Sequence, residues 1–327
     1  MDFSDCNCIG DIELKQELLQ WTSVFPEDEL LYHYTSPEGV MGILEGKNIE
    51  LRFTQIDCLN DATEGSNIIQ YYKNICKQLL NNKDIDKEYF DSIIDILPFK
   101  EACFIYDFDS PKIINGIEYK DHCISEYITY VFCLSTLPDS LPMWNYYLKN
   151  GRYEGFNLGF STLKLKESFH YSSNKRNFSS EFIVVEYEDQ EKDDILKDFI
   201  LALYSYRNKD DTQLLRTKIA ISKELSKWRY AFKPKYFAHE EEIRLAIHLP
   251  LNEDKTMLAP FVKSVIRYDN NSGIPKYIFA PSLDKSALCE ITTSPMCNKK
   301  ESKRILFELS NKGYDVKINH SKIPIRF

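Results

Sequence analysis

An acidic run passes without a break into an apolar strand near residue 240, and this transition strongly constrains the fold. Residues 237–244 (FAHEEEIR) lead directly into residues 245–249 (LAIHL), which have the pattern of a buried strand. Residues two apart on a strand point to the same face, so Glu240, Glu242 and Arg244 would share one face. Two carboxylates this close repel each other, and burial raises their pKa values. We expect either an acid pair kept for chemistry or, as the structural alternative, a solvated strand entrance where Arg244 neutralises one acid.

The size and composition of the chain allow one large domain or two ordinary ones with a substantial core. The chain has 327 residues, of which 43% are hydrophobic and 13% aromatic. Its formal charge of −9 argues against broad coating of nucleic acid, although a local basic groove stays compatible with it. The nine cysteines form no paired C-x-x-C knuckles, so we predict no metal site of that kind and a reducing, cytoplasmic location. We find no signal peptide and no membrane span, and expect no membrane partner.

The periodicity of apolar residues predicts one compact α+β domain at residues 31–327, after an N-terminal helical extension at residues 1–30. Helical insertions are expected at about 61–97 and 190–230, and a polar loop at 106–121. The predicted strands cover residues 31–35, 49–56, 127–135, 155–161, 181–187, 240–249, 264–268, 276–281, 287–293 and 315–318. The predicted helices cover residues 11–22, 36–46, 67–96 with a break near 81–82, 141–148, 190–230 and 302–311.

Two polar clusters besides the acid pair carry residue types that perform chemistry. His33 lies on the first predicted strand, on the face opposite Tyr32 and Tyr34. The structural alternative is a core histidine bonded to a backbone carbonyl. Asp61 follows Asn60 and has Glu64 one helical turn later. There the alternative is a helix cap with a capping box.

A third group of candidates follows the strand of residues 127–135. Ser135 and Thr136 end this strand, and the predicted helix after it is rich in aromatic residues, among them Trp144 and Tyr147. Ordinary core packing is the structural alternative for this helix. The chain has no nucleophile elbow, Walker loop, glycine-rich dinucleotide turn or H-E-x-x-H motif, so the common nucleotide-phosphate cradles are excluded.

The order of short motifs along residues 30–327 resembles a large bacterial family of unknown function. The opening and middle motifs are LYHYT (31–35), GIL (42–44), LRFT (51–54), LNDxxE (59–64), MWxxY (143–147), GFxxGF (155–160) and FxxExExR (237–244). The closing motifs are GY (313–314) and SxIPxR (321–326). This resemblance names no reaction.

The chain also resembles toxin-type ADP-ribosyltransferases that modify DNA or RNA. The shared features are a histidine on the first strand, a short helix ending in glycine and a later Glu-x-Glu strand. The resemblance implies a split β-sheet core with NAD as the substrate. It makes His33 the NAD anchor, Glu242 the catalytic acid and Glu240 the group that orients or deprotonates the acceptor. The further NAD-binding candidates are Tyr34, Thr35, Ser135, Tyr146, Tyr147 and Arg244. Ser135-Thr136 departs from a clear Ser-Thr-Ser motif, and Asn60, Asp61, Glu64 and Trp144 have no counterpart in the transferase pattern.

We therefore expect an NAD-dependent ADP-ribosyltransferase that acts as a bacterial toxin or antiphage-defence effector. Its acceptor would be a nucleic acid or a protein, and an antitoxin or a chaperone would be a further partner. Two alternatives stay open. One is a metal-dependent nuclease or phosphoesterase in which Asp61, Glu64 and the two later glutamates gather Mg²⁺. The other is a non-catalytic sensor of a nucleotide or partner protein.

Overall fold

The computed structural model describes residues 29–59, 68–98, 102–107, 112–114, 117–119, 122–147, 154–176, 179–205, 211–250, 276–279, 283–297 and 299–324. Several predicted features lie outside these ranges: the helix of residues 11–22, the turn with Asn60, Asp61 and Glu64, and the strand of residues 264–268. Among the helices of the described ranges, none has the length and apolar character that crossing a membrane requires.

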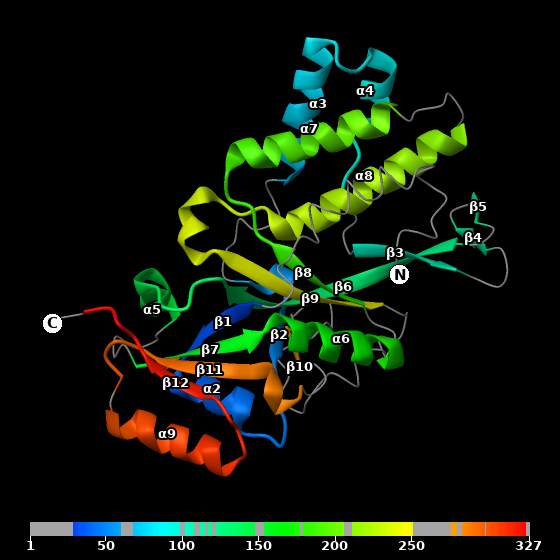
Figure 1. Cartoon of the computed structure of the whole chain (residues 1–327). Helices are drawn as coiled ribbons and strands as arrows, with labels where there is room; N and C mark the ends of the chain where they lie inside the picture. The colour runs from blue at the N-terminus through cyan, green and yellow to red at the C-terminus, as the bar shows by residue number, and fades with distance from the viewer. Residues whose placement is uncertain are drawn as a thin grey trace.

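A large mixed sheet forms the centre of the fold and has helices on both faces, which confirms the predicted α+β class (Figure 1). Its ten described strands follow the order β10-β2-β6-β1-β7-β11-β12, with β3 and β9 paired to β6 and β8 paired to β9. Its neighbouring strands are antiparallel except β11 and β12. The strands are β1 (Leu30–Thr35), β2 (Arg52–Gln55), β3 (Ala102–Asp107), β6 (His122–Ser135), β7 (Phe156–Ser161), β8 (Ser179–Val184), β9 (Glu242–Pro250), β10 (Tyr277–Phe279), β11 (Leu288–Thr293) and β12 (Lys317–His320).

Strand β6 organises the sheet because it pairs along both edges. One edge pairs with β9, from Tyr127↔Pro250 to Ser135↔Glu242. The other edge pairs in succession with β3, β2 and β1. Strand β1 meets β6 at the pair Tyr32↔Ser135 and pairs with β7 along its whole length. The end of β6 therefore lies between β1 and β9, the strands that carry His33 and Glu242.

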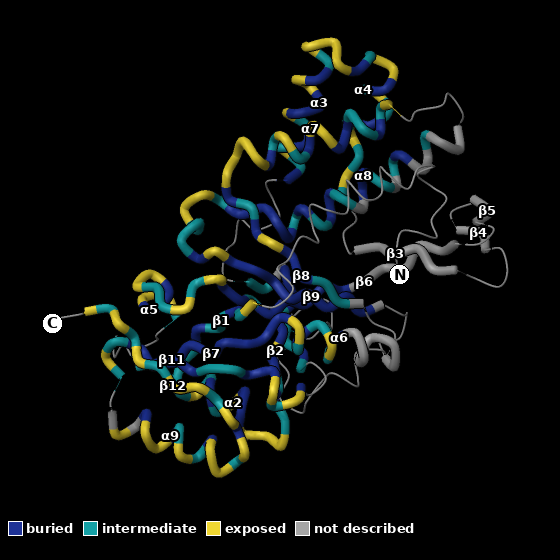
Figure 2. Tube along the Cα trace, in the orientation of Figure 1, coloured by how far each residue is buried: buried dark blue, intermediate teal, exposed yellow. Residues whose placement is uncertain are grey.

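The helices form two layers, one on each face of the sheet (Figure 1). The layer that packs on β8 and β9 contains α3 (Ile68–Asn82), α4 (Lys87–Ile93), α7 (Asp189–Ser205) and α8 (Asp211–Ala231). The opposite layer contains α2 (Pro37–Leu44), α6 (Thr162–Arg176) and α9 (Lys299–Asn311). The shorter elements are α5 (Leu141–Tyr147) and the 3₁₀ helices η2 (Ile56–Cys58), η4 (Lys235–Glu240) and η6 (Lys285–Ala287). Figure 2 shows the strands between the layers as mostly buried and the outward faces of the helices as exposed.

Strand β9 is buried on both faces because it lies between these two layers. Leu245 and Ile247 belong to the core on the α6 side, whereas Ala246 belongs to the core under α7 and α8. By alternation Glu242 and Arg244 face the α7–α8 layer, and both are buried. Buried charged groups need partners, so this face of β9 must carry its own counter-charges.

The polar loop predicted at residues 106–121 is wrong, because part of this segment is β-structure. Strand β3 extends to Asp107 and pairs with the first half of β6. β4 (Lys112–Ile114) and β5 (Ile117–Tyr119) form a separate antiparallel pair. The residues between β4 and β5 are Asn115-Gly116, and Asn-Gly between two strand-like runs is a strong sequence signal for a hairpin. The many polar residues of the segment hid this signal.

Helix α6 was not predicted, and its sequence explains why. It follows β7 directly and has only a weak helical pattern of apolar residues. Leu165 and Phe169, four residues apart, are buried in the core and anchor it to the sheet. Packing against the sheet thus stabilises a helix that local periodicity does not reveal.

Candidate functional site

Glu240 and Glu242 lie on either side of a sharp change in backbone conformation. Helix η4 ends at Glu240 and strand β9 begins at Glu242. Glu241 between them has φ 41° and ψ 54°, the left-handed region that residues other than glycine rarely adopt. Thr136 holds it there, because its amide donates to the Glu241 carbonyl at 3.2 Å and its hydroxyl donates to the Glu241 carboxylate. The prediction of one strand face shared with Arg244 is therefore wrong for Glu240, since the strand starts only at Glu242.

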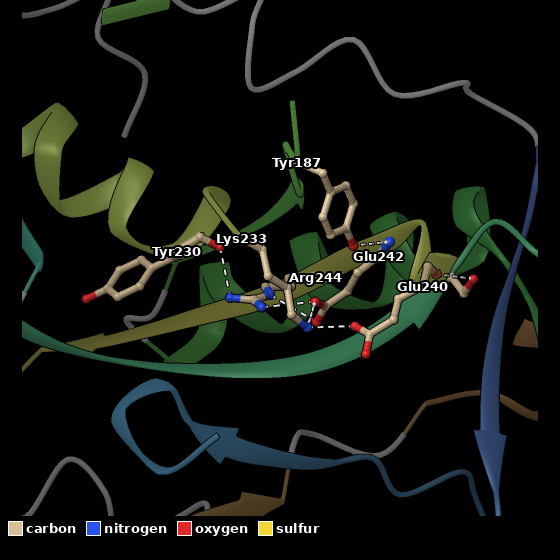
Figure 3. A network of polar contacts seen from close by, with 7 residues as sticks. Tyr187, Tyr230, Lys233, Glu240, Glu242 and Arg244 are labelled. Carbon is tan, nitrogen blue, oxygen red and sulfur yellow. Dashed lines mark hydrogen bonds and ion pairs between the residues drawn. The ribbon is translucent and has the colours of Figure 1, made fainter. Parts of the chain in front are cut away.

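Lys233 nevertheless brings the two carboxylates together (Figure 3). Its Nζ donates to Glu240 Oε2 at 2.6 Å and to Glu242 Oε2 at 3.1 Å. Arg244 holds Glu242 through two parallel bonds, from Nε to Oε1 at 3.0 Å and from Nη2 to Oε2 at 2.9 Å. None of these four residues is more than 8% exposed. Two anions and two cations form a buried cluster with no formal net charge.

The two cations fix Glu242 as a carboxylate anion. Burial raises the pKa of Glu242, but the charges of Arg244 and Lys233 and the bond from Arg244 outweigh it and lower the pKa to about 2. The carboxylates likewise outweigh burial at Lys233, whose pKa is raised. The expectation of a raised pKa is therefore wrong for Glu242, because the two cations outweigh the effect of burial. The alternative of a solvated strand entrance is confirmed in one respect, because Arg244 does neutralise Glu242. It is wrong in the other, because both residues are buried.

Three further groups complete this network, and none was predicted from the sequence. The Tyr187 hydroxyl accepts a bond from the Glu242 amide at 2.9 Å, and the Tyr230 carbonyl accepts one from Arg244 Nη1 at 2.9 Å. The thiol of Cys133 also bonds Glu242, and burial raises the pKa of this thiol well above its usual value. Lys233 was not predicted either. Its spacing from the acids carries no signal, because the turn of η4 sets the distance.

His33 is held by a backbone carbonyl, as its structural alternative expects. Nδ1 lies 2.9 Å from the Cys133 carbonyl, which can only accept, so Nδ1 carries the ring proton. The ring packs on Phe132 with 4.3 Å between centroids. Burial, with a smaller effect of Arg52, outweighs the bond to Cys133 and lowers the pKa of His33 to about 4. The ring is thus neutral at pH 7, and its Nε2 is a hydrogen-bond acceptor.

A small cavity lies among candidate residues from four elements. It is bordered by His33 and Tyr34 of β1, Tyr147 of α5, Glu240 of η4 and Glu242 of β9. Its volume is about 30 Å³, enough for about two water molecules. Pockets for cofactor-sized ligands have volumes of about 300 Å³ or more. The arrangement therefore gathers the candidate residues in a closed form that a larger ligand would have to open.

Four other candidate residues do not border this cavity. Ser135 is fully buried, and its hydroxyl donates to the Glu240 carbonyl at 2.6 Å, which ties the end of β6 to η4. Thr35 packs against Gly39 of α2. Tyr146 lies on the surface with 62% of its area exposed. Arg244 is occupied by Glu242 and a carbonyl, so it positions the acid.

Tyr34 supports the wall of the cavity. Its hydroxyl donates to the Leu137 carbonyl at 2.8 Å and accepts from the Ser140 amide at 3.0 Å. Its ring meets Trp144 of α5 edge to face at 4.7 Å. These contacts hold the loop before α5 and α5 itself, which places Tyr147 over the acid pair.

The lowered pKa of His33 predicts an acid-sensitive contribution to stability. The pKa of His33 is 6.5 in the unfolded chain and about 4 in the folded one. Its contribution to stability is therefore fully present above pH 6.5 and is lost as the pH falls toward 4. Wild-type protein should lose about 1–2 kcal/mol of unfolding free energy from this residue between pH 7 and pH 5. His33→Asn keeps a neutral donor for the carbonyl and should lose less over that interval, as measured by urea unfolding. His320→Asn, an exposed histidine, is the matched control, and an equal pH response of wild type and His33→Asn would contradict the assignment.

Comparison with known proteins finds that the middle of the chain is similar to a sequence family without a known reaction. A family described as "Protein of unknown function (DUF2971)" matches residues 143–245. This stretch runs from α5 into β9 and includes Tyr147, Lys233, Glu240 and Glu242. No curated protein and no solved structure matches the chain. The match supports the resemblance to a family of unknown function over this stretch.

Proposed function

We propose that the chain is an NAD-dependent ADP-ribosyltransferase whose reaction occurs between His33 and the pair Glu240–Glu242. The observation that carries the proposal is the single cavity that these three residues and Tyr147 border. His33 lies on β1 and Glu242 on β9, the strands on either side of the end of β6. The axes of β1 and β9 are therefore about 10 Å apart, and these two strands flank the cavity. The split core of such a transferase would correspond to the end of β6, where β1 and β9 lie on either side of it.

The protonation states suit a ribose between these groups. The neutral His33 and the ionised Glu242 are both hydrogen-bond acceptors, and the hydroxyl groups of a ribose are donors. Breaking the bond between C1′ of this ribose and the nicotinamide nitrogen builds positive charge on the sugar. The nicotinamide leaves as a neutral molecule with the bonding electron pair. A fixed carboxylate in a buried site stabilises this charge. The acceptor then bonds to C1′ and gives its proton to Glu240.

Helix α5 must move for NAD to enter, because the closed cavity is too small. Tyr147 and Met143 of α5 both border the cavity, so a shift of this one helix widens it. Stacking of the exposed Tyr146 on His239 of η4, with centroids 5.0 Å apart, joins α5 to the element that ends in Glu240. Such closure over the substrate excludes water from the reacting centre.

The position of Lys233 disfavours the metal-dependent nuclease. Its ammonium group lies at 2.6 Å and 3.1 Å from the two carboxylates and takes the place that a cation bridging them would need. The other two carboxylates of that hypothesis, Asp61 and Glu64, lie outside the described residues.

The test is incubation of purified protein with NAD labelled in the adenylate part and with separate pools of cellular RNA, DNA and protein. Label on one pool, together with released nicotinamide, is the expected result and identifies the acceptor class. Tyr147→Ala should reduce both signals, because it removes an aromatic wall of the cavity. Tyr277→Ala, in β10, is the matched control. Neither label nor nicotinamide in any pool would overturn the proposal and favour the sensor.

A further inference from the structure

A second, larger cavity lies beside the acid pair, on the other side of Lys233. It has a volume of about 570 Å³, within the usual range for small-molecule sites. Its walls come from the starts of α3 and α7, the end of α8 and the first residues of η4. Lys233 borders this cavity, and its Nζ bonds the two glutamates that border the smaller one. Lys233 therefore connects the walls of the two cavities.

Aromatic side chains form one part of the wall. Trp228 and Phe232 stack with 6.2 Å between centroids and 14° between ring planes. Tyr71 and Tyr236 also border the cavity. Tyr236 is 89% exposed, the largest exposure among the large hydrophobic residues of the described chain. An exposed aromatic ring at the mouth of a cavity offers a face for a flat ligand.

Cationic side chains form another part of the wall, although the formal charge of the whole chain is −9. Besides Lys233, the cavity is bordered by Lys192, Arg229, Lys235 and one carboxylate, Asp189. Lys235 also forms an ion pair with Glu188 at 2.7 Å. Lys192 is almost fully buried, and its Nζ donates to the carbonyls of Tyr187 and Lys233 at 2.9 Å and 2.8 Å and to Asp189 at 3.1 Å. Two backbone carbonyls and the Asp189 carboxylate therefore fix the Lys192 ammonium in the wall of the cavity.

We infer that this cavity binds a nucleotide unit, taken either from a free nucleotide or from a single strand of nucleic acid. Aromatic faces beside cations are the combination that holds a base together with its phosphate. In this site the base stacks at Tyr236, Arg229 faces the phosphate, and Asp189 accepts from an amino or hydroxyl group. The inference depends only on the residues that border this cavity. It therefore holds whether or not NAD is cleaved at the smaller cavity.

The experiment is calorimetric titration of the full chain with adenosine monophosphate and with a tetranucleotide of adenylate. Saturable binding of at least one probe is expected. Tyr236→Ala should weaken it at least about fivefold, because loss of one base–aromatic stack costs about 1–3 kcal/mol. Arg229→Gln should weaken it and reduce its dependence on salt. Tetranucleotide binding at least about tenfold tighter than that of the monophosphate would identify a nucleic-acid strand as the source, and similar affinities a free nucleotide.

The matched control is Phe307→Ala, which removes an exposed aromatic residue from α9, outside the walls of this cavity. It should bind as wild type does. Wild-type protein that binds a probe but does not cleave NAD would count against the proposed function alone. Absence of binding by both probes at about millimolar concentration would overturn the inference. Binding that neither Tyr236→Ala nor Arg229→Gln changes would overturn it as well.

Discussion

Replacement of Arg244 by methionine should lower the free energy of unfolding by about 3–5 kcal/mol. Arg244 donates to both carboxylate oxygens of Glu242 and to the Tyr230 carbonyl, and it is almost fully buried. Methionine fills a similar volume but cannot donate a hydrogen bond. The buried carboxylate of Glu242 then keeps Lys233 as its cationic partner, and the Tyr230 carbonyl loses the bond from Arg244. Removing one partner of a buried ion pair is costly because the other charge stays desolvated. Denaturant unfolding at pH 7 measures the loss.

A double variant separates the lost ion pair from lost packing. In Arg244→Met/Glu242→Met both charges of the pair are gone, so part of the stability should return, and the two substitutions should be clearly non-additive. Lys235→Met is the matched control, because its ion pair with Glu188, 2.7 Å long, is largely exposed and contributes little to stability. A loss below about 1 kcal/mol for Arg244→Met would show that Glu242 does not depend on it.

The part of the site that follows from alternation was predictable. Residues 245–249 form a strand, and the side chains of Glu242 and Arg244 share its face because the period of a strand is two. Glu240 was placed on the same strand because nothing in the sequence marks Glu241 as left-handed. Glycine or asparagine would have been the signal there. Two bonds from Thr136, a residue distant in the sequence, hold that conformation instead.

The charge state of the acid pair was not predictable from its own residues. Burial alone would raise the pKa of Glu242, and the sign reverses only because Lys233 and Arg244 both reach it. The position of Lys233 depends on how α8 leads into η4, which no local pattern shows. The identity of helices and strands is largely a local property, whereas the protonation of a buried group depends on tertiary neighbours.

The second large expected effect concerns the different roles of Glu240 and Glu242 in the proposed reaction. Glu240→Gln should lower transfer of ADP-ribose to the acceptor by about 10²- to 10⁴-fold, the usual loss when a general base is removed. Release of nicotinamide should persist, because Glu242 keeps its charge and its contacts with Arg244 and Lys233. Glu242→Gln should abolish both signals. It also leaves the buried Arg244 facing a neutral side chain and Lys233 with Glu240 in place of two carboxylates, so it must be assayed well below its unfolding temperature.

The exposed residue between them provides the matched control, since Glu241→Gln makes the same chemical change without touching the cavity. The amide oxygen of glutamine can still accept the bond from the Thr136 hydroxyl. It should transfer and release nicotinamide as wild type does. Nicotinamide and labelled acceptor are measured in the same reaction, so the ratio of the two is independent of the folded fraction. Glu240→Gln would then show a ratio of nicotinamide to labelled acceptor raised by the same 10²- to 10⁴-fold. An unchanged ratio would mean that both carboxylates act on the same bond-breaking step, because a group that only activates the acceptor cannot slow release of nicotinamide to water.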